Sequence, residues 1–152
     1  MSIKVSIDAS GGDFGFPVTI NAGINALMSF RDLHLNFVGD EKGIKEELEK
    51  KSIHKSLLDR IDITHASEII NMDDSPSIAL RHKKDSSMRV AINLVQSGIS
   101  DACVSAGNTG ALMSIARFVL KTIEGVDRPA IMSAFPTITG PTHVLDLGAN
   151  VD

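Results

Sequence analysis

The fold is indicated by one stretch, ACVSAGNTGALMSIARFVLK at residues 102–121, in which three patterns follow one another. Residues 102–105 form a short apolar run that ends at a serine, as a buried strand does. Residues 106–110 include two glycines, which are typical of a tight turn. From residue 111 onward, apolar residues return every three or four positions, which predicts an amphipathic helix. This stretch is therefore expected to form a strand, a turn and a helix in succession.

The same alternation extends outward along the chain. Strands are predicted at residues 3–7, 33–38, 61–64, 130–135 and 143–147, and helices from Pro17, over residues 41–51 and from residue 85 to a stop at Gly98. Strands that alternate with helices predict an α/β fold with a mostly parallel sheet covered on both faces. No repeat or linker interrupts the pattern, so residues 1–152 are expected to form a single domain. The chain stops directly after a predicted strand, so we expect the domain to be incomplete at its C-terminus.

The composition excludes several classes of protein. The 152 residues carry 15 basic and 19 acidic side chains, and the net charge of -4 gives no overall attraction for nucleic acid or anionic lipid. Aromatic residues make up 4%, which leaves little surface for stacking on bases. Cys103 is the single cysteine, so no internal disulfide can form and a reducing, cytoplasmic location is expected. The histidines show no metal-ligand spacing, and we expect no metal.

Ligands of open parallel sheets bind beyond the carboxyl ends of the strands, and the first candidate loop there is residues 105–110. Gly107 and Gly110 allow the backbone to approach a ligand closely. Asn108 or Thr109 can cap the following helix, whose first N–H groups would then bind an anion. An ordinary tight turn with a helix cap explains the same residues equally well.

The second candidate loop is RHKKDSS at residues 81–87. Arg81 and Lys84 are cations that lie just before a predicted helix start, where Asp85 or Ser86 would be the cap. Together with the hydroxyls of Ser86 and Ser87, these cations suit a phosphate dianion. The alternative interpretation is a solvated basic loop, as most charge runs are.

The third candidate loop, residues 8–15, directly follows the first predicted strand and contains Asp8, Gly11, Gly12 and Asp13. It fails the dinucleotide fingerprint because Asp13, not glycine, stands two residues after Gly11. A glycine turn capped by Asp8 is the alternative. The fourth loop, residues 146–152, is polar, and Asn150 is a plausible hydrogen-bond donor there.

At these loops the sequence resembles the phosphate acyltransferases of bacterial phospholipid synthesis, the PlsX family. The family pattern Asp-Ala-Met-Gly-Gly-Asp appears as DASGGD at residues 8–13, with Ser10 in place of the usual methionine. Further matching segments are ALR at residues 79–81, KKDSSM at residues 83–88, SAGNTGAL at residues 105–112, GVDRPA at residues 125–130 and LDLGANVD at residues 145–152. The resemblance covers the whole chain, and family members are about twice as long.

The resemblance implies a three-layer α/β/α sandwich, similar to the isocitrate dehydrogenase and phosphotransacetylase architecture. It also implies transfer of an acyl group from acyl carrier protein to inorganic phosphate, which gives acyl phosphate without a cofactor. Members of the family are homodimers, cytoplasmic but peripherally associated with the inner face of the membrane. Their product supplies a membrane acyltransferase that acts on glycerol 3-phosphate.

For such chemistry, we expect Lys84 and Arg81 to neutralise phosphate and Ser86 and Ser87 to hydrogen-bond it. The expected catalytic residues are Lys84, Asn108, Thr109 and Asn150, and the expected substrate-binding residues are Asp8, Gly11, Gly12, Asp13, Arg81, Ser86, Ser87, Gly107 and Gly110. Two alternatives stay open: a phosphotransacetylase-type enzyme that uses acyl-CoA, and a non-catalytic fragment that binds anions.

Overall fold

A computed structural model of the protein describes residues 2–127 and 129–145. The chain divides into two compact units, Met1–Leu120 and Lys121–Asp152, and each is treated by itself. The sequence predicted a single domain over residues 1–152. Because that depends on how the two units are joined, it stays a prediction. Within the described ranges, no helix has both the length and the apolar character that a membrane span requires.

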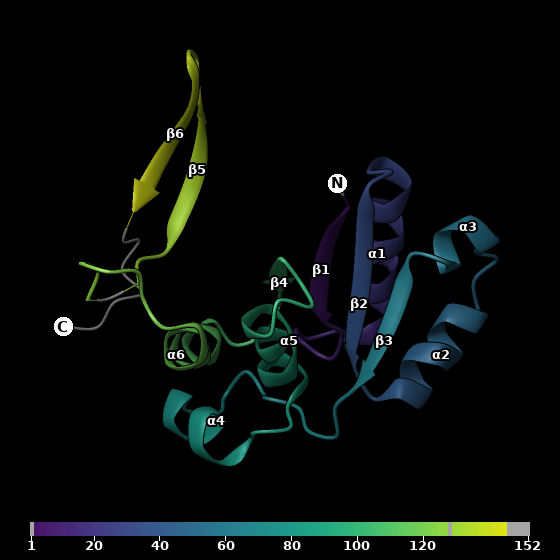
Figure 1. The fold of residues 1–152 in the computed structure, drawn as a ribbon, viewed down its shortest axis with the longest axis horizontal. Coiled ribbons are helices and arrows are strands. Elements are labelled where there is room, and N and C mark those ends of the chain that lie inside the picture. The colour runs from purple at the N-terminus through teal and green to yellow at the C-terminus, as the bar shows by residue number, and fades with distance from the viewer. Residues whose placement is uncertain (1, 128, 146–152) are drawn as a thin grey trace. The chain divides into compact units, whose positions relative to one another are not determined.

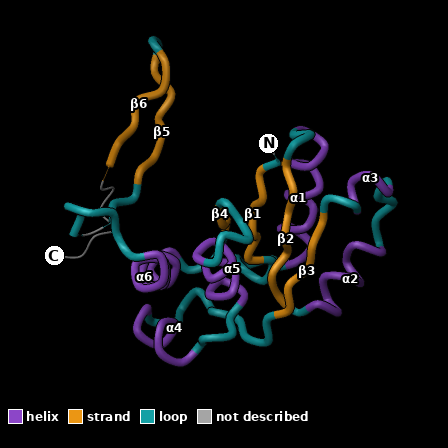
Figure 2. Tube along the Cα trace, in the orientation of Figure 1, coloured by secondary structure: helices purple, strands orange, loops and turns teal. Residues whose placement is uncertain are grey.

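The first unit contains a four-stranded parallel sheet with the strand order β3-β2-β1-β4 (Figures 1 and 2). Its strands are β1 (Ile3–Asp8), β2 (Leu33–Gly39), β3 (Ile61–His65) and β4 (Ala102–Val104). The register of β1 on β2 runs from Ile3 opposite Leu33 to Asp8 opposite Val38. The predicted α/β fold with a mostly parallel sheet is thus confirmed, and all four strands end at the same edge, called the carboxyl edge below.

Helices lie on both faces of this sheet, as the alternation along β1 requires. Val5 and Ile7 point to the face that carries α1, whereas the Ser6 hydroxyl donates to the Ala91 carbonyl of α5 at 2.9 Å on the other face. The helices of the unit are α1 (Phe16–Ser29), α2 (Glu41–Glu49), α3 (Lys55–Leu58), α4 (Pro76–His82), α5 (Ser87–Gln96) and α6 (Thr109–Leu120). The short helices α3 and α4 were not predicted from the sequence.

Each face has its own hydrophobic core. On the α1 face, Ile20 and Leu27 pack with Phe37 of β2 and Ile44 of α2. Gly23 of α1 is essential to this packing, because a Cβ there would lie 2.5 Å from Cζ of Phe37. On the α5 face, the residues that form the core come mainly from α5 and α6: Met88, Ile92, Ala111, Ile115 and Val119.

The second unit contains a β-hairpin of β5 (Met132–Thr137) and β6 (Gly140–Leu145). The two strands pair antiparallel, with Ser133 opposite Val144. The sequence predicted both strands, but it gave no sign of this pairing and placed them at residues 130–135 and 143–147. Only residues 138 and 139 separate them, and so short a connection can join strands only in the antiparallel sense.

Candidate functional site

Three of the predicted loops meet at the carboxylate of Asp8, the last residue of β1. Asp8 is 2% exposed. One of its carboxylate oxygens, Oδ1, accepts a hydrogen bond from the Ser87 hydroxyl at 2.6 Å, and Oδ2 accepts one from the Ser105 hydroxyl at 2.6 Å. Ser87 begins α5, and Ser105 follows β4. These three residues, the Asp8 cluster, hold the ends of two strands and the start of a helix together.

Glycines allow the loops around the Asp8 cluster to approach one another. A Cβ on Gly11 would lie 2.6 Å from Oδ2 of Asp8, and a Cβ on Gly12 would lie 3.2 Å from the Ala106 carbonyl oxygen. Gly12 also has a φ of +84°, a conformation that favours glycine. The loops at residues 8–15 and 105–110 are therefore in direct contact, as a shared site requires.

Asn108 caps α6, and both ends of its side-chain amide have protein partners. Its Oδ1 accepts a hydrogen bond from the Ala111 N–H at 3.0 Å, which confirms the predicted cap. Its Nδ2 donates to the carbonyl oxygens of Met72 at 3.0 Å and Asp74 at 2.9 Å. The amide therefore fastens the loop before α4 to the start of α6. Its predicted role as a donor to substrate gains no support from these contacts and stays a prediction.

The first turn of α6 exposes Thr109 and Gly110 beside this cap. The opening N–H groups of any helix lack partners within the helix and attract anions. A Cβ on Gly110 would lie 3.1 Å from Cγ of Pro76, so the start of α4 packs against this turn. Backbone donors, more than the Asn108 side chain, are what this loop can offer a ligand.

Ser86 and Ser87 are buried, with 0% and 1% exposure, and their hydroxyls bond within the protein. The Ser86 hydroxyl donates to the Lys83 carbonyl oxygen at 2.8 Å and accepts from the Arg89 N–H at 3.3 Å. Ser86 is thus the cap of α5, one of the two predicted caps. The expectation that both serines bind phosphate stays a prediction, because their hydroxyls are engaged elsewhere.

The cations of the second loop fall into two groups. Arg81 lies in the last turn of α4, not in a loop as predicted, and both Arg81 and Lys84 are exposed. Lys83 is fixed instead, because its Nζ donates to the Ile69 carbonyl oxygen at 2.7 Å and to Oδ2 of Asp74 at 2.6 Å. The hydrogen bond from Lys83 is the main reason that the pKa of Asp74 lies below its ordinary value. Arg81 and Lys84 therefore present their charges to solvent, and Lys84 lies three residues before Ser87 of the Asp8 cluster.

The turn that carries Lys84 is held by the segment before it. The Asp85 carboxylate accepts hydrogen bonds from the N–H of Ser67 at 2.9 Å and from its hydroxyl, and these bonds lower the pKa of Asp85. The Asp85 N–H donates to Oε2 of Glu68 at 2.9 Å, and the Ser87 N–H donates to the Glu68 carbonyl oxygen at 3.1 Å. The sequence did not point to Ser67 and Glu68, because their hydrogen-bond partners lie about 18 residues further along the chain.

Other candidates are weaker. Burial raises the pKa of the Cys103 thiol, and the nearby Asp8 carboxylate raises it further, so this thiol is a poor nucleophile near neutral pH. Across residues 2–127 and 129–145, no group of three or more His, Cys, Asp or Glu side chains is placed to hold a metal ion. Asp13 is exposed at the tip of its loop. Asn150, like the rest of the fourth loop, lies outside the described residues.

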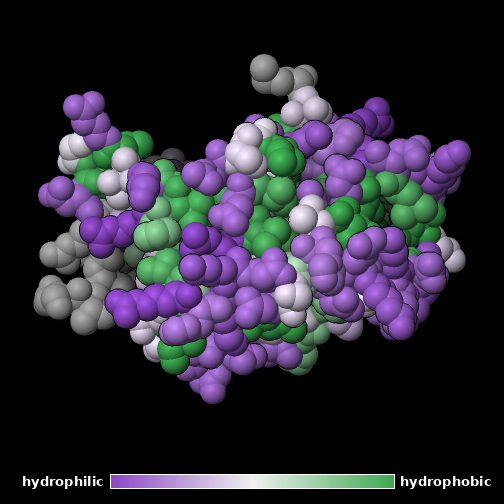
Figure 3. Space-filling model, turned by 60° about the horizontal axis from the view of Figure 1, so that its bottom comes forward, coloured by the Kyte–Doolittle hydropathy of each residue, from purple (hydrophilic) through white to green (hydrophobic). Residues whose placement is uncertain are grey.

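The carboxyl edge is a largely hydrophilic surface. Figure 3 turns this side of the first unit toward the viewer, and purple, hydrophilic residues cover most of it, with green, hydrophobic areas between them. Sequence reasoning named most of the residues at this edge but missed Ser105 as the second partner of Asp8. Asp8 ends β1 and Ser105 directly follows β4, and knowledge that β1 and β4 are neighbours would have identified the pair.

Comparison with known proteins gives a consistent result. A family described as "fatty acid synthesis protein" matches residues 3–152. The phosphate acyltransferase of Vesicomyosocius okutanii is 68% identical over all 152 residues, and that of Ruthia magnifica is 66% identical over the same length. The phosphate acyltransferase of Methylococcus capsulatus is 57% identical over 148 residues, which is 97% of this chain. The chain spans about 44% of the length of the first two relatives and 43% of the third.

Proposed function

The chain belongs to the fatty acid synthesis protein family, and on that premise we propose that it carries the phosphate-handling part of a phosphate acyltransferase. The reaction moves an acyl group from acyl carrier protein to inorganic phosphate and yields acyl phosphate and the free carrier thiol. Its product would enter bacterial phospholipid synthesis through a membrane glycerol-3-phosphate acyltransferase. The proposed partners are therefore acyl carrier protein and phosphate, in a cytoplasmic homodimer that associates with the membrane peripherally.

The observation that carries this proposal is the junction of three loops at Asp8. Strand ends far apart in the sequence, at Asp8 and Ser105, are joined to the start of α5 by the two hydrogen bonds of the Asp8 carboxylate. The exposed first turn of α6 begins four residues after Ser105, and the exposed cations Lys84 and Arg81 precede Ser87 by three and six residues. Backbone donors and cations gathered at one edge of a parallel sheet are what a phosphate site requires.

The chemistry needs little from the protein beyond charge and position. Phosphate is its own nucleophile, since a phosphate group with a second pKa of about 6 carries nearly two negative charges at neutral pH. The leaving thiol has a pKa of about 8.5 and departs as a thiolate with little proton transfer. The protein has to neutralise the dianion, hold it against the thioester carbon and stabilise the oxyanion that forms there.

We assign these tasks to separate groups. Lys84 and Arg81 neutralise phosphate, and the N–H groups of Thr109 and Gly110 donate to phosphate or to the oxyanion. The Asp8 cluster positions these elements and does not itself bind the dianion, because a buried carboxylate repels phosphate. Ser86 and Ser87, whose hydroxyls bond to Lys83 and Asp8, act in the same supporting way.

The test uses the full-length Vesicomyosocius okutanii enzyme, because the chain spans 44% of that relative. Alanine is placed at the position aligned with Lys84, and release of the carrier thiol is followed at rising phosphate concentration. We expect a loss of about a hundredfold in turnover at low phosphate, the size typical of a removed charge-stabilising group. Alanine at the position aligned with Lys42, an exposed residue of α2, is the matched control.

Unchanged turnover at the Lys84 position would contradict the assignment of the phosphate site. Donor identity is tested separately, by comparison of acyl-CoA with acyl carrier protein in the unmodified enzyme. A preference for acyl-CoA would replace the carrier protein in the proposal and leave the phosphate site intact. Phosphate binding by the 152-residue chain without turnover would instead favour the non-catalytic, anion-binding alternative for this chain.

A further inference from the structure

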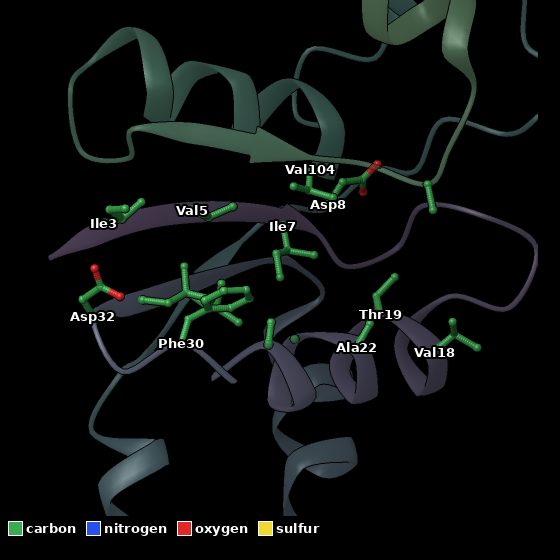
Figure 4. Close-up of a pocket in the computed structure, with 15 residues that line it drawn as sticks. Ile3, Val5, Ile7, Asp8, Val18, Thr19, Ala22, Phe30, Asp32 and Val104 are labelled. Carbon is green, nitrogen blue, oxygen red and sulfur yellow. The ribbon is translucent and has the colours of Figure 1, made fainter. Parts of the chain in front are cut away.

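An apolar groove runs along β1 on the face of the sheet that carries α1 (Figure 4). Its volume is about 460 Å³. Figure 4 shows the side chains of Ile3, Val5 and Ile7 in a row along β1, with Val18 and Ala22 of α1 across from them. Asp32 lies at one end of the view and Val18 at the other, and almost all of the lining of the groove is apolar.

The groove is a bare part of a face that parallel sheets normally cover. Several of the side chains that line it are about half exposed, with 56% for Val104, 53% for Val18 and 60% for Phe30. On the opposite face, α5 covers the same strands, and Ser6 there is fully buried. All-parallel sheets occur almost always with both faces covered by helices. Among the described helices of the first unit, none covers this face beside β1 and β4, so the face is a candidate docking surface.

The shape of the groove indicates a helix as that partner. Val18, Ala22 and Ala26 are spaced by four residues and line one stripe of α1 along the groove. Two alanines in such a stripe allow a second helix to approach to the usual axial separation of about 8–10 Å. A helix seated there would lie beside α1 and cover Val104 and Ile3.

The polypeptide that directly follows β4 does not fill this position. Ile115 of α6 packs with Met88 and Ile92, so α6 lies on the α5 face. Right-handed crossovers to further strands beyond β4 would also place their helices on the α5 face. The covering helix must therefore come from a segment that returns to the α1 face. The two relatives contain additional polypeptide from which such a helix can come, because this chain spans only 44% of their length.

We propose that the groove between β1, β4 and α1 is the docking surface for a helix from the part of the phosphate acyltransferase polypeptide that lies outside these 152 residues. This inference goes beyond the proposed function and does not depend on it. It assigns the groove to chain assembly, and it predicts that neither an acyl chain nor a second copy of the protein occupies the groove.

The test measures how readily a cysteine in the groove reacts with a soluble maleimide. Ala22→Cys is made in this chain, and cysteine is placed at the aligned position of the full-length Vesicomyosocius okutanii enzyme, both without other reactive cysteines. The matched control is cysteine at Lys42, on the exposed side of α2. We expect labelling at position 22 to be at least tenfold slower in the full-length enzyme than in this chain, and labelling at position 42 to be equal in both.

Equal labelling at position 22 in the two proteins overturns the proposal, because the groove would then be open in the longer polypeptide. So does protection in the full-length enzyme that appears only when a fatty acyl ligand is added. Protection of the 152-residue chain that grows with its own concentration also overturns the proposal, since a second copy would then be the occupant. Within the full-length enzyme alone, labelling at position 22 that is as fast as labelling at position 42 also overturns the proposal, and this comparison does not depend on the stability of the short chain.

Discussion

Two sets of polar residues at the carboxyl edge look alike in the sequence but differ in the structure. Asp8, Ser87 and Ser105 are joined to one another and largely removed from solvent, whereas Arg81 and Lys84 are exposed. A change in the first set lowers the stability of the fold, because buried groups that lose their hydrogen-bond partners cannot bond to water instead. The second set is available to a ligand. The difference separates residues that build the site from residues that can act in it.

Among the substitutions that test this difference, Asp8→Ala is expected to have the largest effect on stability. The change removes two hydrogen bonds to a charged acceptor and leaves the Ser87 and Ser105 hydroxyls without their partner. We expect a loss of about 3 kcal/mol in the free energy of unfolding, measured by urea denaturation. Asp8→Asn keeps the shape and should lose less. A loss below about 0.5 kcal/mol for Asp8→Ala would mean that the cluster does not support the site.

A smaller loss is expected for Asn108→Ala. The variant removes the cap of α6 and the bonds from Nδ2 to the carbonyl oxygens of Met72 and Asp74. Loss of a helix cap typically costs about 1–2 kcal/mol. Thermal unfolding followed by circular dichroism measures the change, and Asn108→Asp, which keeps the cap oxygen, is the control. Unchanged stability of Asn108→Ala would show that the side chain is not needed for the fold, and it would favour the role in substrate binding that the sequence predicted.

The comparison is sharpened by the pH dependence of Asp74→Asn. The pKa of Asp74 is depressed, mainly by the hydrogen bond from Lys83, so the stability it contributes is present above the ordinary carboxyl pKa of about 4. That stability is lost as the pH falls through the folded-state pKa. We expect the variant to be slightly less stable than the natural chain at pH 7 and equal to it in strong acid. A constant difference at all pH values would contradict the ion pair.

The smallest effect on stability is expected for Arg81→Ala. Arg81 is exposed in the last turn of α4, and surface changes of this kind usually shift stability by no more than about 0.5 kcal/mol. The same variant should weaken phosphate binding, measured by isothermal titration at low and high salt. Substantial unfolding of Arg81→Ala would place Arg81 with the framework residues and remove it from the proposed phosphate site.

Local patterns predicted much of this fold. The strand at residues 3–7, the helix stop at Gly98 and the strand–turn–helix at residues 102–121 were all close to the observed elements, since each is signalled by neighbouring residues. The α4 helix was missed because Pro76 and its neighbours look like turn formers, although a proline also suits the first turn of a helix. The pairing of β5 with β6 was missed because an apolar strand pattern does not indicate which other strand it pairs with.

The sequence by itself determined the α/β class, the family resemblance and the loops at which polar residues gather. It could do so because periodicity, caps and glycine turns are properties of adjacent residues. Only the tertiary structure decided which of those polar groups face each other and which face solvent. Ser87 and Lys84 are three residues apart in one motif, yet the helix start turns one inward to Asp8, 79 residues away, and leaves the other exposed. Hydrogen bonds over such separations depend on strand order, which the sequence of a single chain does not state.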